Sequence, residues 1–358
     1  MGQFRIAYVA LLLLLAGSLF SAAVRAQDPS DMPHIQPRLS AGAAAALEEK
    51  LKTNPDDLEV REQLLDYYFV SHISNKSPEI EQKRETLIFW LIEHHPESEF
   101  AGTPEAEIMP VDSIGSVDGY QRAKQLWLEQ VEKHPSDTRV LRNASSFFAT
   151  SDDKLSRDLL NKAALVNPND TETISMLAQS YELQSERPQS AEQKKALAEK
   201  ALALREQSLD KTDNEKRFVA LDQLAVDAFA AGDSVKAQQY ASELLRLAPE
   251  FKDSWNYGNA IHKGNMILGL VALQHDDIPG AKQYLLASGQ TPGSPQLDSF
   301  GPNMTLAKAL LEKGETETVV AYLESCKLFW KMGGRELQNW IVLVKGGGSP
   351  DFSSNLNY

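Results

Sequence analysis

The residue types that most often bind metals or perform catalysis are few in this chain and poorly placed for either role. Glu93, His94 and His95 are consecutive, and Glu97 follows two residues later. Adjacent side chains on a helix point about 100° apart, so two neighbouring histidines cannot hold one ion from a single helix. His95 lies at a predicted helix C-terminus, where the helix dipole favours an imidazolium. The pattern therefore predicts no metal site here.

Two further candidates have structural explanations. His275–Asp276–Asp277 falls at a predicted hairpin turn, where short polar residues are expected. Cys326, the only cysteine, lies on the small-residue face of a predicted helix, and we expect a buried thiol. The sequence contains no nucleophile elbow, no phosphate-binding loop and no zinc-protease motif. We expect no catalytic residues, no bound metal and no cofactor.

The charge balance argues against another class of partner. The 358 residues include 36 Lys and Arg against 50 Asp and Glu, which gives a formal net charge of −14. Nucleic-acid binding needs a basic surface that neutralises phosphates, so we expect no nucleic-acid partner. Hydrophobic residues make up 42% of the chain, which is enough for a buried core. A single cysteine excludes an internal disulfide framework.

The N-terminus has the order of a secretory signal peptide. Arg5 precedes an apolar stretch from Ile6 to Phe20, and small residues follow up to Ala23 and Ala26. This order predicts cleavage near Ala26 or Ala23 and a periplasmic or secreted mature form that does not span a membrane. If the apolar stretch is taken to continue to Val24, it has 19 residues. This is close to the roughly 20 residues that a membrane-spanning helix needs, so an uncleaved membrane anchor is the alternative.

The rest of the chain alternates amphipathic helical runs with a recurring proline turn. Proline cannot continue a helix, and a following Asp or Ser can cap the next helix. Successive turn prolines lie 41, 39, 33 and 81 residues apart. A recurrence of roughly 30–40 residues, with two helices per unit, is typical of an α-solenoid. The turn prolines are Pro55, Pro96, Pro135, Pro168 and Pro249.

Between Phe218 and Phe251, small and apolar residues line two predicted helices, Gly232 lies at the turn, and Pro249 ends the unit. The lining residues are Leu221, Leu224, Ala225, Ala228, Ala237, Ala241 and Leu244. This pattern resembles a tetratricopeptide repeat (TPR). The same spacing recurs in further copies, and the resemblance is good over roughly residues 119–329 and fainter over 39–99. The resemblance implies an all-α fold, a right-handed α-solenoid of TPR-like helix hairpins with a C-terminal capping helix.

Breaks in the repeat pattern divide the chain. We expect a signal peptide (1–26), a proline-bearing linker (27–38), an N-terminal helical TPR-like part (39–100), a connector (101–119), the main TPR-like array (120–330), and a capping helix with a flexible tail (331–358). Within the array, residues 184–193 lengthen a hairpin, and Ser190 is expected to cap the following helix. Residues 289–302, rich in Pro and Gly, are expected to form a long loop.

The TPR resemblance implies a ligand groove along the first helices of successive hairpins. The groove positions are Ser175, Gln179, Glu182, Asp222, Val226, Phe229, Met266, Leu270, Leu273, Met304, Lys308 and Leu311. Such a groove would be acidic at one end and apolar at the other, which suits an amphipathic or partly basic protein segment. Alternatively, the helix expected over 335–345 covers the apolar end. Asn256 and Asn259 are candidates for clamping a peptide backbone, or else belong to a helix start that packs into a neighbouring repeat.

These features predict a non-enzymatic, exported interaction module that binds another protein or peptide, because stacked helix pairs offer a long surface without catalytic groups. Two alternatives remain open. One is a structural scaffold subunit of an envelope assembly. The other is an enzyme or small-molecule binder with its site in non-repeat segments, such as residues 101–119 or the C-terminal tail.

Overall fold

The computed structural model describes residues 39–74, 77–109, 116–185, 187, 189–209 and 214–356. These residues form α-helices and short 3₁₀-helices and contain no strand, which confirms the predicted all-α class. The predicted signal peptide and linker lie outside the described residues. The chain forms two compact units, Met1–Thr173 (unit 1) and Ile174–Tyr358 (unit 2). None of the described helices is both long and apolar enough to cross a membrane.

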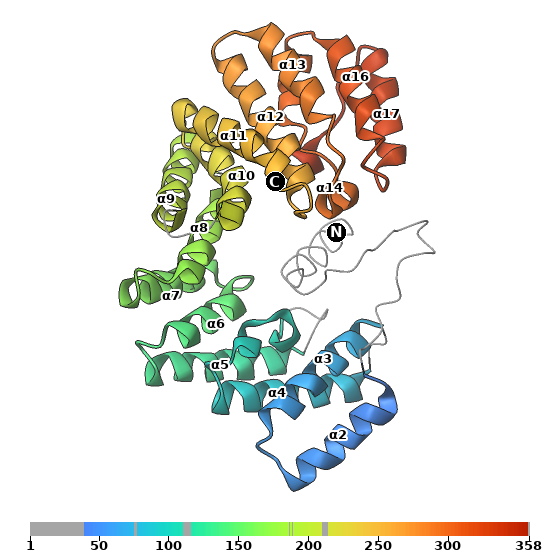
Figure 1. Ribbon diagram of the computed structural model, residues 1–358. Helices are drawn as coiled ribbons and strands as arrows, with labels where there is room; N and C mark the ends of the chain where they lie inside the picture. The colour runs from blue at the N-terminus through green and yellow to red at the C-terminus, as the bar shows by residue number, and fades with distance from the viewer. Residues whose placement is uncertain are drawn as a thin grey trace. The chain divides into compact units, whose positions relative to one another are not determined.

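Unit 1 is a series of helix hairpins joined by short turns (Figure 1). The turn at Pro135 has the predicted form: α5 ends before the proline, and the Asp137 carboxylate accepts hydrogen bonds from the backbone N–H groups of Arg139 and Val140. The core includes Leu91 and Trp127, which are at most 1% exposed. The α-helices are α2 (Ala41–Thr53), α3 (Leu58–Ser74), α4 (Pro78–His94), α5 (Val117–Lys133), α6 (Thr138–Phe148), α7 (Asp153–Val166) and the start of α8 (Thr171–Ser185).

The predicted connector (101–119) is part of the core of unit 1 over its first nine residues. There it completes the 3₁₀-helix η3 (Glu99–Gly102) and forms η4 (Pro104–Ala106). Arg84 on α4 is 1% exposed and donates hydrogen bonds from Nη2 to the carbonyl oxygens of Glu105, at 2.9 Å, and Glu107. Burial lowers the pKa of Arg84 to about 10. A buried guanidinium thus holds the connector on α4.

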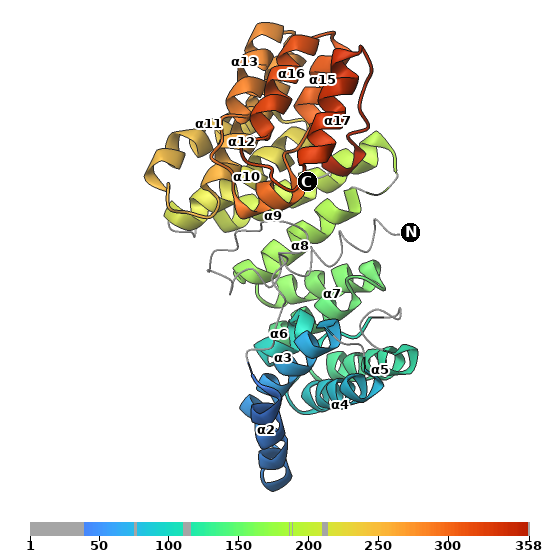
Figure 2. The ribbon, with the colours of Figure 1, turned by 90° about the vertical axis from the view of Figure 1, so that its right-hand side faces the viewer.

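Unit 2 repeats the helix hairpin. α10 (Asn214–Ala230) packs on α11 (Ser234–Leu247), and α12 (Tyr257–Gln274) packs on α13 (Ile278–Ser288) (Figure 1, Figure 2). Ala225 and Ala241 are fully buried, and Gly232 has φ +77° at the turn, as the TPR register predicts. The other helices are the rest of α8, α9 (Ala191–Leu209), η5 (Ala248–Glu250), α14 (Pro295–Phe300), α15 (Thr305–Glu312), α16 (Thr316–Cys326), α17 (Gly334–Lys345) and η6 (Ser353–Asn355). The fold is an α-solenoid of TPR-like hairpins.

Three local features of unit 2 can be compared with the sequence predictions. Ser190 caps α9 as predicted, because its Oγ accepts a hydrogen bond from the Gln193 N–H at 3.2 Å. The predicted long loop over 289–302 instead contains α14, since Ser294 Oγ accepts from the Leu297 N–H at 3.0 Å and starts a helix. The segment 335–345 is a helix, α17, as predicted, and it packs on α16.

The end of the chain packs on unit 2 rather than extending freely. Phe352 is 2% exposed, and its ring meets that of Trp340 edge to face at 4.8 Å. The Asn355 side chain donates to the carbonyl oxygen of Phe300 at 2.9 Å, and its backbone carbonyl accepts from the Met304 N–H at 2.7 Å. The expected flexible tail therefore closes the end of the stack over these residues.

Candidate functional site

The predicted groove positions lie on the first helices of the unit 2 hairpins: α8, α10, α12 and α15. Ser175 and Gln179 on α8 and Lys308 on α15 are exposed, whereas Glu182 and Phe229 are half-buried. The remaining site residues of the prediction, Asp222, Asn256, Asn259, Met266 and Leu270, are buried. The predicted site is therefore only partly available at the surface.

Burial of α12 corrects the apolar end of the predicted groove. Met266 and Leu270 are 4% and 7% exposed and belong to the hydrophobic core of unit 2. The cause is the close approach of α15 to α12: a side chain at Gly269 would collide with Leu306. A ligand could touch Met266 or Leu270 only if this packing opened.

The two candidate clamp residues bind the protein itself. Asn259 Nδ2 donates to Asn256 Oδ1 at 3.1 Å and to Gln296 Oε1 at 3.0 Å, and Asn259 Oδ1 accepts from Ser294 at 2.6 Å. Asn256 is fully buried and Asn259 is 2% exposed. These amides fasten the segment around α14 to the start of α12, which matches the packing alternative.

A charged cluster that the sequence did not predict joins α8, α9 and α10. Arg205 Nη2 lies 2.8 Å from Glu182 Oε2, and Arg205 Nε lies 2.8 Å from Asp227 Oδ2. Gln223 donates to both carboxylates. Desolvation raises the pKa of Asp227 to about 6. With two carboxylates and one guanidinium, the cluster is net negative when ionised, and 27% of the Glu182 side chain is exposed.

A second pair joins α10 to α12. Lys263 Nζ lies 3.4 Å from Asp222 Oδ2, and both side chains are less than 15% exposed.

Beside these charges, four half-buried apolar side chains pack against the core while keeping part of their surface open. We call them the apolar row: Val226 and Phe229 on α10, Leu273 on α12, and Leu311 on α15.

The histidines near the end of α4 have partners within their own helix and turn. His94 Nδ1 is 2.9 Å from the carbonyl oxygen of Trp90, and the two rings stack at 4.8 Å. His95 Nδ1 lies 3.4 Å from Glu97 Oε1. Across the described residues, no group of three His, Cys, Asp or Glu side chains is arranged to hold a metal ion.

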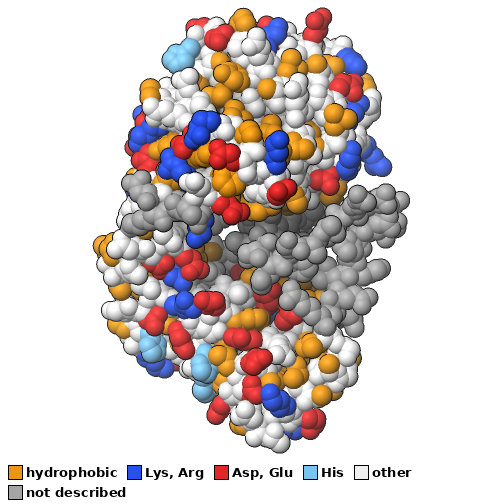
Figure 3. All heavy atoms as spheres, in the orientation of Figure 1, with side chains coloured by type: hydrophobic (Ala, Val, Ile, Leu, Met, Phe, Trp, Pro, Cys, Tyr) orange, Lys and Arg blue, Asp and Glu red, His pale blue; other side chains and the backbone are white. Residues whose placement is uncertain are grey.

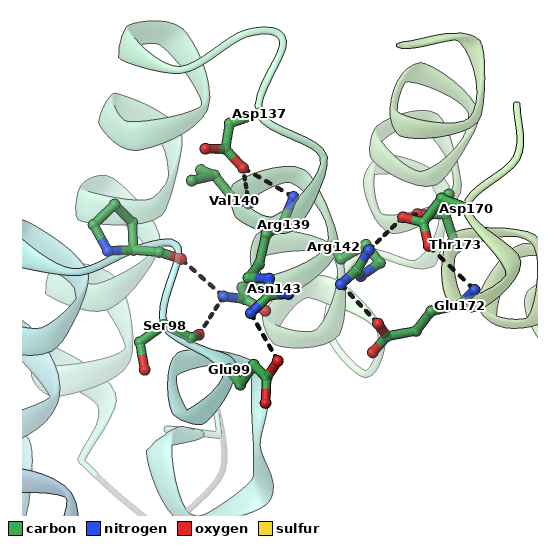
Figure 4. A network of polar contacts seen from close by, with 11 residues as sticks. Ser98, Glu99, Asp137, Arg139, Val140, Arg142, Asn143, Asp170, Glu172 and Thr173 are labelled. Atoms are coloured by element: carbon green, nitrogen blue, oxygen red, sulfur yellow. Dashed lines mark hydrogen bonds and ion pairs between the residues drawn. The ribbon is translucent and has the colours of Figure 1, made fainter. Parts of the chain in front are cut away.

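A polar network in unit 1 joins α6 to its neighbours (Figure 4). Arg142 pairs with Asp170 and, at 2.7 Å, with Glu172. Asn143 donates to the carbonyl oxygens of Pro96 at 2.8 Å and Ser98 at 2.7 Å. The Arg142 side chain is 8% exposed. Because these groups bind one another within the unit, their role is to fix the turns around α6.

One hollow in each unit can be described from its lining residues. One in unit 1 has a volume of about 20 Å³, room for one water, and is lined in part by Gly102, Glu107 and Phe147. The other, about 450 Å³, is an open hollow lined by polar residues of α11, including Gln239 and Arg246. In Figure 3 acidic and basic side chains are interspersed on the visible surface.

Comparisons with known proteins give only remote similarity. No family model matches the sequence. No curated protein matches it either. A structure of the human IFIT1 dimer with m7Gppp-AAAA is 16% identical with a TM-score of 0.46, covering 85% of this chain and 67% of that one. A monomeric IFIT1 mutant with the same compound is 14% identical with a TM-score of 0.38, covering 80% and 66%.

Proposed function

We propose that this protein is a non-enzymatic, exported interaction module that binds a protein or peptide segment along the first helices of unit 2. The observation that carries the proposal is the apolar row. Its four side chains come from three successive first helices, and each keeps part of its surface open although its other side packs on the core. A row of apolar anchors on adjacent helices suits a segment laid across them.

The charges beside the apolar row define the chemistry of the partner. The Glu182–Arg205–Asp227 cluster has one carboxylate more than it has cations, and Glu182 is its most exposed acid. A basic residue of the partner would balance that charge. The proposed ligand is therefore an amphipathic segment with apolar anchors and a Lys or Arg near the α8 end.

The absence of enzymatic activity is part of the proposal. The Cys326 thiol is completely buried, and burial raises its pKa well above the usual range, so it stays protonated at neutral pH. A protonated, enclosed thiol is a poor nucleophile. The buried amide of Asn259 is likewise bound to the protein's own polar groups, one of which is Asn256 Oδ1.

Site-specific photo-crosslinking in the native host tests the binding proposal. A photo-reactive residue at Phe229 should capture a discrete partner, identified by mass spectrometry. The matched control carries the photo-reactive residue in place of Val235, which is 65% exposed on α11. It should not capture the partner that is captured at position 229. Equal capture at both positions would remove the apolar row as the binding surface. A fixed-stoichiometry complex would favour the scaffold subunit over the module.

Export is tested separately by the mass of the protein. The sequence order at the N-terminus supports cleavage, so the intact mass outside the cytoplasm should correspond to a chain that begins at Gln27 or Val24. If the full-length protein is found in the membrane instead, the N-terminal segment is an uncleaved anchor and the cleavage prediction is wrong.

A further inference from the structure

The two carboxylates of the Glu182–Arg205–Asp227 cluster are bound by the same two donors. Gln223 Nε2 donates to Glu182 Oε1 and, at 3.3 Å, to Asp227 Oδ1. The Arg205 guanidinium lies 2.8 Å from the other oxygen of each acid, through Nη2 to Glu182 and through Nε to Asp227. Because one amide nitrogen and one guanidinium bind both acids, the two carboxylates lie close together and repel one another when both are ionised.

The two acids differ in their access to water. The Asp227 side chain is 4% exposed, and that of Glu182 is 27% exposed. Loss of water and a neighbouring carboxylate both favour the protonated form of an acid. The pKa of Asp227 is accordingly raised to about 6, with burial as the largest cause, Arg205 opposing it and Glu182 adding to it. A proton taken up by this pair therefore resides on the more buried acid, Asp227.

The helices α11 and α12 also pack on α10, and they bring lysines to it. These lysines have acidic partners of their own, Lys236 with Glu206 at 2.7 Å and Lys263 with Asp222 at 3.4 Å. Within the described part of the chain, Arg205 is the cation that forms an ion pair with Asp227. The cluster therefore has one net negative charge when both acids are ionised, and none when Asp227 is protonated.

We propose that protonation of Asp227 regulates ligand binding along the apolar row, so that acidification releases the ligand. This regulation rests on the proposed function, because it acts on the Lys or Arg that the ligand is expected to place beside Glu182. Asp227 directly follows Val226 of the apolar row, so the titrating group adjoins the binding surface. Loss of its charge removes Coulomb attraction for that cation and should lower the affinity by roughly fivefold.

Cross-linking at several pH values tests the regulation. The full chain with a photo-reactive residue at Phe229 is mixed with a cell extract of the native host, adjusted to values between pH 7.5 and pH 5.0. Capture of the partner should fall severalfold, with a midpoint near pH 6. Asp227→Asn should capture as weakly at pH 7.5 as the unsubstituted chain does at pH 5.0, and its capture should no longer depend on pH.

A matched control removes a carboxylate elsewhere in unit 2. Glu243→Gln on α11 changes the net charge by the same amount as Asp227→Asn, and Glu243 is paired with Arg217 instead of Arg205. This variant should keep the pH profile of the unsubstituted chain. Circular dichroism and thermal melting check that each variant is folded.

The proton itself is observed without any ligand. Carbon-13 NMR of the full chain with labelled aspartate should show one carboxyl signal that titrates near pH 6 and is missing in Asp227→Asn. This measurement and the pH profile of the unsubstituted chain decide the matter even if Asp227→Asn melts early.

The outcomes separate the regulation from the function on which it rests. If no partner is captured at Phe229 at any pH, the proposed function is wrong and the regulation falls with it. If a partner is captured equally at pH 7.5 and pH 5.0, the regulation alone is wrong. An Asp227 signal that titrates with the ordinary pKa of an aspartate, near 4, would also overturn it. So would a pH profile that Glu243→Gln flattens as much as Asp227→Asn does.

Discussion

The imidazole Nε2 of His262, on α12, accepts a hydrogen bond of 3.1 Å from the backbone N–H of Asn303, 41 residues later. An imidazole nitrogen accepts a hydrogen bond only when it carries no proton, so this bond requires a neutral ring. The ring is buried, with 1% of His262 exposed. Asn303 directly precedes Met304, whose N–H is bound by the chain's last segment through Asn355. The state of this one ring therefore affects how α12, the α14 segment and the C-terminal tail are held together.

The first prediction is that acid destabilises unit 2 through His262. Burial lowers the pKa of His262 from 6.5 to about 4, so the unfolded chain binds a proton at a pH where the folded chain does not. The free energy of unfolding should therefore be unaffected by His262 above about pH 6.5. Between about pH 6.5 and pH 4 it should fall by roughly 3 kcal/mol, because the unfolded chain takes up the proton first. Denaturation curves between these limits should show this decline.

His262→Gln separates this effect from other titrations. The glutamine amide can accept a hydrogen bond but does not titrate, so the variant should show a smaller loss of stability on acidification. Asp227 acts in the opposite direction, because its pKa is raised and its protonation favours the folded state. The difference between wild type and variant isolates the histidine. Identical pH dependence in both proteins would contradict the assignment.

The second prediction concerns two arginines on α6 that differ in burial. Arg142→Met removes the partner of Asp170, whose side chain is 14% exposed, and should reduce the stability of unit 1 by roughly 3 kcal/mol. Arg139→Met breaks a pair with Glu99, which is 83% exposed, and should cost less than about 1 kcal/mol. Equilibrium unfolding followed by tryptophan fluorescence compares them. Similar costs would mean that the Arg142 network is not a structural centre of the unit.

Much of the fold could be predicted from the sequence because its signals are local. A turn proline and a following Asp define helix ends within four residues, as at Pro135 and Asp137. The small residues Ala225 and Ala241 identify the helix crossing because only small side chains fit there. The ordered connector could not be predicted, since it depends on Arg84 reaching carbonyl groups more than twenty residues away.

The candidate site was less predictable, because its properties depend on contacts between helices. The TPR register gave the positions of Glu182 and Phe229, but it did not show which groove positions neighbouring helices would cover. Arg205 and Asp227 are 22 residues apart, and no spacing rule links residues on different helices. Their pairing depends on how α9 and α10 cross, which becomes visible only in the folded chain.

The third prediction tests the close approach of the α14 segment to α12. A Cβ at Gly258 would collide with the carbonyl oxygen of Gly293 and lie 3.1 Å from Thr291 Oγ1. Gly258→Ala should therefore destabilise unit 2 by roughly 1–3 kcal/mol despite the better helix propensity of alanine. Gly42→Ala on α2, where nothing lies within 4 Å, is the control and should gain up to about 1 kcal/mol. Equal gains in the two variants would contradict the contact.

The last prediction decides whether the apolar end of the predicted groove is core or surface. Met266→Glu with Leu270→Glu places two carboxyl groups where the native side chains are 4% and 7% exposed. Without partners there, they should reduce stability by roughly 4 kcal/mol or more, whether they ionise or take up protons. Lys308→Glu changes an exposed groove position on α15 and should leave the melting temperature nearly unchanged. If the double variant melts like wild type while losing the partner captured at Phe229, both side chains are accessible and the groove extends along α12. A large drop in melting temperature restricts the groove to the apolar row and the exposed positions of α8 and α15.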